Sequence, residues 1–390
     1  MRYDFETLVN RKGTGSDKWD LMYQINPDAG DSVPLSVADM EFLNAPEIKT
    51  GLADYLEEVI LGYTGPTEAY FEAVKGWMKR RHDFNVETEW IVPTSGVVPA
   101  LFHAVKAYTD PGDGVIIMPP VYYPFNRAIL QNGRKIVENP LRRLENGYEI
   151  DYEDLEEKAK APDAKLLILS NPHNPVGRVW KREELERVAR ICLEHGVFVI
   201  SDEIHQDLMM PGYRHVSMGT LEDDLASNCV ICTAPSKTFN TAGLGTSNII
   251  IRDPKRREAF VKSKESVCGG NGSMMGYKAC EIAYNQCEDW LEQLLEYIDG
   301  NRKAAEDFFG EHFPTVRVHR MEGTYLLWVD LSPLGYSYQE LEEKFQKEAK
   351  VFLDEGYIFG KQGEGFERIN LACPRRVLMD ALERMRKVLA

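Results

Sequence analysis

An amide, a carboxylate and an amine each follow a buried apolar segment of the sequence. They are Asn174, Asp202 and Lys237, which come after the apolar runs at 165–170, 197–201 and 228–233. Singly, a turn, a helix cap and a solvated surface amine are the ordinary explanations for such residues. Together they match what pyridoxal phosphate needs, because its aldehyde condenses with a lysine and a buried carboxylate keeps its ring nitrogen protonated.

A fourth feature offers a place for the phosphate group. Residues 94–99 open an apolar-periodic segment, and Pro99 suits the first turn of a helix. The main-chain N–H groups of Gly96 and Val97 would then lie at the positive end of the helix dipole, where anions bind. A Ser-Gly pair before a helix is weak evidence alone, but its position upstream of the other three residues strengthens it.

The sequence around these groups alternates between segments with the hydrophobic pattern of buried strands and segments with that of helices. Apolar runs of buried-strand type occur at 115–118, 165–170, 197–201, 228–233 and 248–251, and residues 181–195 have the pattern of a helix ended by Gly196. This alternation predicts an α/β fold with a mostly parallel central sheet flanked by helices. Ligands bind beyond the carboxyl ends of the strands in such sheets, which is where the polar residues fall.

The last third of the chain has a different pattern. We expect helices near 290–309 and 377–389, a strand at 324–329 and an amphipathic segment at 338–350. These elements predict a smaller α+β domain. The expected division is a large cofactor-binding domain over residues 46–285, with residues 1–45 and 286–390 forming the N-terminal segment and the small domain.

The amino-acid composition narrows the classes of molecule that this protein could bind. The 390 residues are 43% hydrophobic, which suffices for a conventional core, and carry a formal net charge of −16. This charge disfavours nucleic acid and anionic membrane surfaces, so a phosphate must be held by a local device. No segment reaches the roughly 18 to 20 apolar residues of a spanning helix. We therefore expect a soluble protein.

The seven cysteines have no disulfide rhythm, which favours a reducing cytoplasm. Cys229 and Cys232 form a CxxC, but they lie in an apolar run without a second CxxC or a His pair. A strand interior is the better interpretation than a zinc or redox site, and no metal is expected.

Seven segments in sequence order resemble fold-type I pyridoxal-phosphate enzymes of the aminotransferase class I/II group. They cover residues 10–19, 37–42, 62–66, 170–178, 201–205, 235–240 and 365–375. The chain is most similar to the MalY/PatB branch of cystathionine β-lyases (C–S lyases). The resemblance implies an aspartate aminotransferase-like fold, pyridoxal 5'-phosphate as cofactor, and a homodimer with shared active sites.

By this resemblance Lys237 binds the cofactor aldehyde and later takes the substrate Cα proton, for which its pKa should be lowered. Asp202 would pair with the ring nitrogen, and Asn174 would donate to the phenolic oxygen. His205 falls where many relatives have a tyrosine near that oxygen, although a structural histidine is nearly as good an interpretation.

The resemblance also assigns the groups around the cofactor ring and phosphate. Tyr122 would stack on the ring, with adjacent Tyr123 as the alternative. Gly96 and Val97 would bind the phosphate through main-chain amides, and Ser236 would add a hydroxyl. The tyrosine that matches Tyr63 reaches the phosphate from the neighbouring subunit.

Arg368 matches the arginine that binds the substrate α-carboxylate, and its two-pronged guanidinium suits that task. Arg375 and Arg376 are the competing candidates. Two departures concern the pocket: Ser36 stands where the family commonly has tryptophan, and residues 238–245 lack the arginine of many aminotransferases.

The resemblance implies β-elimination from L-cystathionine or a related cysteine S-conjugate, an amino-acid thioether, giving a thiol, pyruvate and ammonia. The alternative is an aminotransferase, which shares the same lysine, aspartate and arginine but needs a keto acid. A third interpretation, from another class, is a regulatory protein-binding role, as in some members of the branch.

Overall fold

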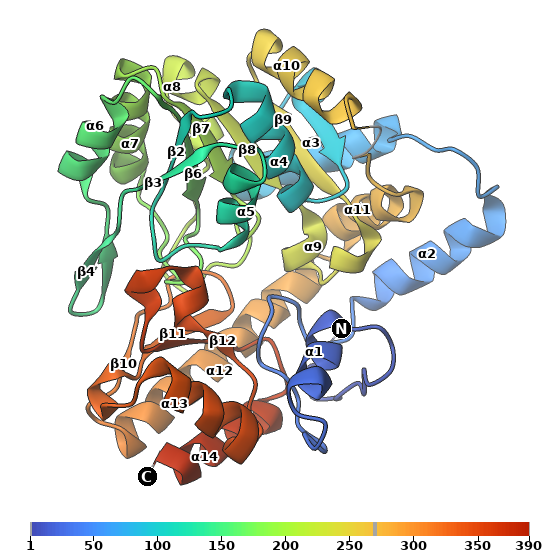
Figure 1. The fold of residues 1–390 in the computed structure, drawn as a ribbon. Helices are drawn as coiled ribbons and strands as arrows, with labels where there is room; N and C mark the ends of the chain where they lie inside the picture. Colours follow the sequence, from blue (N-terminus) through green and yellow to red (C-terminus); the bar gives the residue numbers. More distant parts are fainter. Residues whose placement is uncertain (1, 268–270, 390) are drawn as a thin grey trace.

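A computed structural model describes residues 2–267 and 271–389, and Cys268 lies outside them. The described residues form two main sheets and a separate two-stranded hairpin (Figure 1). The larger has seven strands in the order β1-β9-β8-β7-β6-β2-β3. Their bounds are β1 Ile91–Thr94, β2 Gly114–Ile117, β3 Lys135–Glu138, β6 Ala164–Ser170, β7 Phe198–Asp202, β8 Cys229–Thr233 and β9 Ser247–Ile251.

The strands that carry the predicted polar residues run parallel. β3, β2, β6, β7 and β8 are parallel neighbours, whereas β9 is antiparallel to both β8 and β1. The predicted segment 248–251 is therefore a strand, but one of reversed direction. The carboxyl ends of β6, β7 and β8 consequently open on the same edge.

Alternate residues of these strands enter two separate apolar clusters, one on each face of the sheet. One face is covered by α4 Val97–Tyr108, α5 Pro124–Leu130 and α10 Pro254–Glu265. The other cluster includes residues of α3 Glu68–His82, α6 Tyr152–Ala159, α7 Arg182–Glu194, α8 Asp223–Ser227 and α11 Met274–Gln286, and it extends to the helices beside the smaller sheet. Burial on both faces explains why the strands read as continuous apolar runs.

The smaller sheet is antiparallel, in the order β10-β11-β13-β12. Its strands are β10 Arg317–Val318, β11 Leu326–Asp330, β12 Asp354–Glu355 and β13 Phe366–Asn370. α12 Glu288–His312, α13 Tyr338–Glu343 and α14 Arg375–Leu389 accompany it, and a π-helix, Lys344–Ala349, continues α13. The predicted segment 338–350 is thus helical but changes its hydrogen-bond pattern midway.

The N-terminal segment lies against this smaller part of the molecule, as Figure 1 shows for α1 Asp17–Ile25. The backbone N–H of Leu35 donates to Phe352, and that of Asn370 donates back to Leu35. Residues from the two ends of the chain therefore share one set of hydrogen bonds.

The remaining elements are short or peripheral. They are α2 Pro46–Glu58, the hairpin β4 Arg142–Leu144 and β5 Gly147–Glu149, α9 Pro235–Thr238, and 3₁₀ turns at Thr88–Trp90, Met218–Thr220, Ala242–Leu244, Ser332–Leu334, Gly356–Phe359 and Lys361–Gly363. In the described ranges, no helix is long and apolar enough to cross a membrane. Cys229 and Cys232 are buried in β8, as predicted, and no cluster of metal-binding side chains occurs among the residues described.

Candidate active site

A cavity lies at the carboxyl edge of the large sheet, where it faces the small one. Nine of the ten predicted site residues line it: Gly96, Val97, Tyr122, Asn174, Asp202, His205, Ser236, Lys237 and Arg368. They come from the ends of β6 and β7, the start of α4, the short helix α9 and strand β13. The tertiary structure therefore brings together residues that are up to 272 positions apart.

Tyr63 is the predicted residue that the cavity does not include. It lies in the exposed loop after α2, and its own side chain is fully exposed. Ser36 is buried beside the site but does not line it, whereas its neighbours Val37 and Ala38 do.

Lys237 sits in the first turn of α9, which Pro235 begins. Its Nζ donates a hydrogen bond to the main-chain oxygen of Ala38 at 2.7 Å. The pKa of Lys237 is lowered to about 8; burial is the main cause, the cation of Arg368 adds to the lowering, and the carboxylates of Asp39 and Asp202 oppose it. The predicted lowering is confirmed. Near neutral pH a useful fraction of this amine is neutral and able to accept a proton.

Asp202 ends β7 with a side chain that is almost wholly buried. Its Oδ1 accepts a hydrogen bond from the backbone N–H of Ile204 at 3.2 Å. Burial raises the pKa of this carboxyl to about 7. A carboxyl held in this state can share a proton with a basic ring nitrogen, which is the partner that pyridoxal phosphate offers.

Two more observations fit that cofactor. Gly96 precedes α4 without a side-chain cap, so the first-turn N–H groups of the helix are available where Gly96, Val97 and Val98 line the cavity. Within the described chain, Nδ1 of His205 and Oγ1 of Thr246 are buried without a hydrogen-bond partner. Donors and acceptors of this kind suit the polar substituents of the ring and its phosphate.

His205 is a neutral imidazole in this setting. Burial lowers its pKa well below the usual value, and the cations of Lys237 and Arg368 add to the effect. The ring contacts Tyr325 edge to face at 5.9 Å between centroids. His205 therefore has both a packing role and a free nitrogen at the cavity.

Tyr122 and Tyr123 both line the cavity, but they face different groups. Burial raises the pKa of both, and Asp202 contributes to the shift of Tyr122 but not to that of Tyr123. Tyr123 contacts Phe359, in the 3₁₀ turn after β12, at 6.0 Å between ring centroids. Tyr122 is also the more buried of the two, since Tyr123 is 38% exposed, so we favour Tyr122 as the aromatic residue of the site.

Arg368 is 2% exposed and is held from three sides. Its Nη1 donates to Oδ1 of Asn174 at 2.8 Å, its Nε donates to Oδ2 of Asp354 at 3.1 Å, and its Nη2 forms an ion pair with the same carboxylate. The guanidinium also lies over the ring of Phe359. A fixed two-pronged cation of this kind can bind a carboxylate.

The structure separates Arg368 from its two competitors. Arg375 begins α14, where its Nε donates to Asn301, and Arg376 borders a different cavity beside Lys350. Neither lines the cavity that contains Lys237.

Sequence reasoning missed several residues of the site. Asp354 holds Arg368 and accepts the backbone N–H of Val37 at 2.9 Å, and Ala38 contributes only a carbonyl oxygen. Asp354 carries no motif, and a carbonyl is present at every residue. Thr246, which carries no motif either, also lines the cavity.

The comparisons with known proteins agree with this geometry. Residues 31–385 match the family described as aminotransferase class I and II. The chain is 43% identical to cystathionine beta-lyase PatB of Bacillus subtilis, covering 99% of this chain and 100% of PatB. It is 30% identical to protein MalY of Escherichia coli, with 96% of each chain covered.

Solved structures give the same result. The crystal structure of cystalysin from Treponema denticola, which contains pyridoxal 5'-phosphate, superposes with a TM-score of 0.98 at 50% identity, over 100% of this chain and 99% of that one. A C–S lyase from Staphylococcus hominis with bound pyridoxal phosphate gives 0.91 at 31% identity, with 100% and 99% covered. The chain therefore has the aspartate aminotransferase-like fold and belongs to the aminotransferase class I and II family, in the branch that contains PatB and MalY.

Proposed function

We propose that this protein is a pyridoxal-phosphate-dependent carbon–sulfur β-lyase. Its substrate would be L-cystathionine or a related cysteine S-conjugate, and its products a thiol (homocysteine from cystathionine), pyruvate and ammonia. The observation that carries the proposal is one cavity in which Lys237, Asp202 and Arg368 converge, in a chain of the PatB and MalY branch.

The residues present would hold the cofactor as follows. Asp202 would bind the ring nitrogen, Asn174 the phenolic oxygen, and Tyr122 one ring face. The first-turn amides at Gly96 and Val97, with the Ser236 hydroxyl, would bind the phosphate. When bound, pyridoxal phosphate supplies an electron sink that stabilises the negative charge left at the substrate Cα.

Arg368 would bind the α-carboxylate of the substrate. Because Asn174 and Asp354 already fix the guanidinium, the substrate meets a preformed site. With its carboxylate bound there, the rest of the substrate would lie in the cavity that Lys237 also lines, and its Cα proton would face the lysine amine.

Lys237 would remove that proton. Its amine, with a pKa near 8, accepts the Cα proton, and the electron pair of the broken C–H bond forms the Cα=Cβ bond as the Cβ–S bond breaks. The sulfur leaves as a thiolate, and the three-carbon fragment reacts with water to give pyruvate and ammonia.

We also propose a homodimer in which Tyr63 serves the neighbouring subunit. Tyr63, Ile60 and Leu61 form an exposed, largely apolar loop after α2, with Ile60 89% and Leu61 74% exposed. Within one chain Tyr63 is outside the cavity. Mixing Tyr63→Ala with Lys237→Ala subunits should restore part of the lost activity, because one hybrid site would be intact.

The lyase is tested with purified, cofactor-loaded enzyme and L-cystathionine in the absence of any keto acid. We expect pyruvate and free thiol in equal amounts. An aminotransferase would require a keto acid, and loaded enzyme that forms neither product would contradict the proposal.

Lys237→Ala should lower turnover between about 10² and 10⁴-fold, because the proton acceptor is removed. The matched control is Lys264→Ala: burial also lowers the pKa of Lys264, but this lysine lies outside the cavity. Its activity should stay normal. Normal turnover in Lys237→Ala would refute the assignment.

A further inference from the structure

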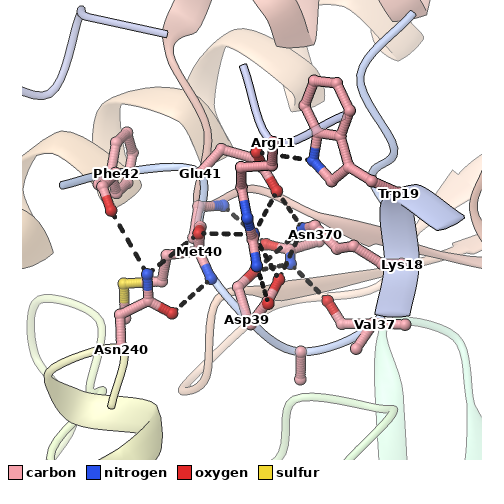
Figure 2. A network of polar contacts seen from close by, with 12 residues as sticks. Arg11, Lys18, Trp19, Val37, Asp39, Met40, Glu41, Phe42, Asn240 and Asn370 are labelled. Atoms are coloured by element: carbon pink, nitrogen blue, oxygen red, sulfur yellow. Dashed lines mark hydrogen bonds and ion pairs between the residues drawn. The ribbon is translucent and has the colours of Figure 1, made fainter. Parts of the chain in front are cut away.

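A network of four charged side chains lies behind the cavity and joins the N-terminal segment to residues 37–42 (Figure 2). Lys18 Nζ is 3.0 Å from Asp39 Oδ1 and 2.8 Å from Glu41 Oε1. Arg11 pairs with the same two carboxylates, at 2.9 Å from Asp39 and 3.0 Å from Glu41. Two cations and two anions therefore share four ion pairs.

Half of the network lies deep in the molecule, whereas the side chains of Arg11 and Asp39 are 25% and 24% exposed. Lys18 and Glu41 are each 2% exposed, and the free oxygen of Glu41 accepts a hydrogen bond from Trp19 Nε1 at 3.1 Å. Burial of a charge is costly unless an opposite charge compensates it. Removing one side chain of the network would leave such an uncompensated charge. The network therefore constrains the backbone that carries it.

That backbone contacts Lys237 directly. The carbonyl of Ala38 accepts hydrogen bonds from Lys237 Nζ at 2.7 Å and from the hydroxyl of Tyr325 at 2.9 Å. On either side, Asn370 Nδ2 donates to the carbonyls of Val37 and Asp39. The position of the lysine amine thus depends on residues 37–39.

A second set of hydrogen bonds links the same segment to the residues that follow Lys237. Asn240 lies three residues after Lys237, and its side chain binds both the N–H and the carbonyl of Met40 (Figure 2). Lys237 and Asn240 are therefore both hydrogen-bonded to the segment that carries Asp39 and Glu41.

We propose that Asp39, held by Lys18 and Arg11, is a positioning residue for Lys237: it fixes the Ala38 carbonyl against the lysine amine, and its own carboxylate is carried by the residue next to Ala38 along the chain. This inference rests on the proposed role of Lys237. Asp39 does not touch the substrate in this scheme.

Four charged groups act on the lysine amine from the elements around it. Asp39 and Asp202 favour its protonated form, and Arg368 and Lys18 oppose that form. Glu41 belongs to the same network, but it is buried against Arg11, Lys18 and Trp19 and lies further along the chain from Ala38 than Asp39 does. We therefore expect Glu41 mainly to stabilise the network and Asp39 to be the carboxylate of the network that acts on the lysine.

The test is a pH titration of the visible absorbance of the cofactor-loaded enzyme, which reports the protonation of the nitrogen that joins the cofactor to Lys237. Asp39→Asn should lower the midpoint by roughly one pH unit, because a carboxylate that favours the cation is lost. Lys18→Gln should move the midpoint in the opposite direction, because a nearby cation is lost.

Two further variants separate this effect from a loss of stability. Glu41→Gln should lower the melting temperature while leaving the midpoint unchanged. Asp299→Asn removes a carboxylate that Arg302 and Lys303 share on α12, a similar arrangement outside the cavity, and should leave the midpoint unchanged.

An unchanged midpoint in Asp39→Asn would overturn the proposal. Midpoint shifts of the same sign in Asp39→Asn and Lys18→Gln would also overturn it, because a general loosening of the network would then explain both shifts. If Lys18→Gln does not fold, the contrast between Asp39→Asn and Glu41→Gln still decides. The titration needs no thioether cleavage, so failure of the lyase assay remains a separate result.

Discussion

Two neighbouring cross-strand pairs of the small sheet differ in their charges, because one joins an acidic residue to a basic one and the other joins two acidic residues. Strands β12 and β13 place Asp354 opposite Arg368 and, one residue further along, Glu355 opposite Glu367. Because side chains alternate between the faces of a sheet, the two pairs face opposite sides. Asp354 and Arg368 face Asn174 and the cavity, whereas Glu355 accepts a hydrogen bond from Gln346 of the π-helix.

The two faces treat buried charge differently. Arg368 is ionised beside a carboxylate, which offsets the cost of its burial. On the other face, burial raises the pKa of Glu355 to about 7, and burial together with the carboxylates of Glu355 and Asp354 raises the pKa of Glu367 well above its usual value. One face keeps a charge available for a ligand, and on the other face the raised pKa values favour the neutral form of the carboxyls.

The largest effect is expected from breaking the pair at the cavity. Asp354→Asn leaves the guanidinium of Arg368 buried without a counter-ion, which should lower the free energy of unfolding by about 3 to 5 kcal/mol in denaturant titrations. Asp380→Asn is the control, since Asp380 is 60% exposed and its partner Arg384 is 31% exposed. Its loss should cost less than about 1 kcal/mol. Equal losses in both variants would contradict the comparison.

A gain in stability is expected on the other face. The pKa of Glu367 is higher in the folded state, so the unfolded chain loses its proton first and stability falls as pH rises above about 4.3. Glu367→Gln removes this dependence and should raise the free energy of unfolding at pH 8 by about 2 kcal/mol.

The matched control is Glu343→Gln, because Glu343 is 63% exposed. It should leave the pH dependence of unfolding unchanged. A Glu367→Gln variant that is less stable than the parent at pH 8 would show that the carboxyl has a favourable partner in its ionised form.

The smallest effect is expected from Glu355→Gln. Because the folded pKa of Glu355 is about 7, its contribution to stability is lost between about pH 4.3 and pH 7 and is constant above that range. Glu355 is only partly buried, so solvent screens the effect, and a change below about 1 kcal/mol at pH 8 is expected. Denaturation at pH 5, 6, 7 and 8 tests this, and a slope between pH 5 and pH 7 as steep as that of the parent would count against it.

Much of the fold follows from the local sequence. The strands at 165–170, 197–201 and 228–233 and the helix at 181–195 were predicted from period and turn residues, and the structure confirms them within about two residues. The segment at 248–251 forms the predicted strand but runs antiparallel to both neighbours, since direction depends on the connection and not on the apolar run. The division into two domains stays a prediction.

The chemistry of the site was also largely contained in the sequence. Asn174, Asp202 and Lys237 follow strand ends, and parallel strands place such residues at one edge, so their convergence could be inferred without coordinates. The place of Arg368, from the other end of the chain, came from the resemblance, and the structure confirms that it reaches the same cavity.

The sequence by itself therefore determined the strands, the helices and the residue types that act on a cofactor, because these depend on local periodicity and on chemistry that each side chain carries alone. Only the tertiary structure decided which neighbouring groups set the charge state of these residues. Asp354 beside Arg368, the Ala38 carbonyl on Lys237, and the pairing of Lys18 with Asp39 join distant segments. Burial and partners fix a pKa, and both exist only after the chain has packed.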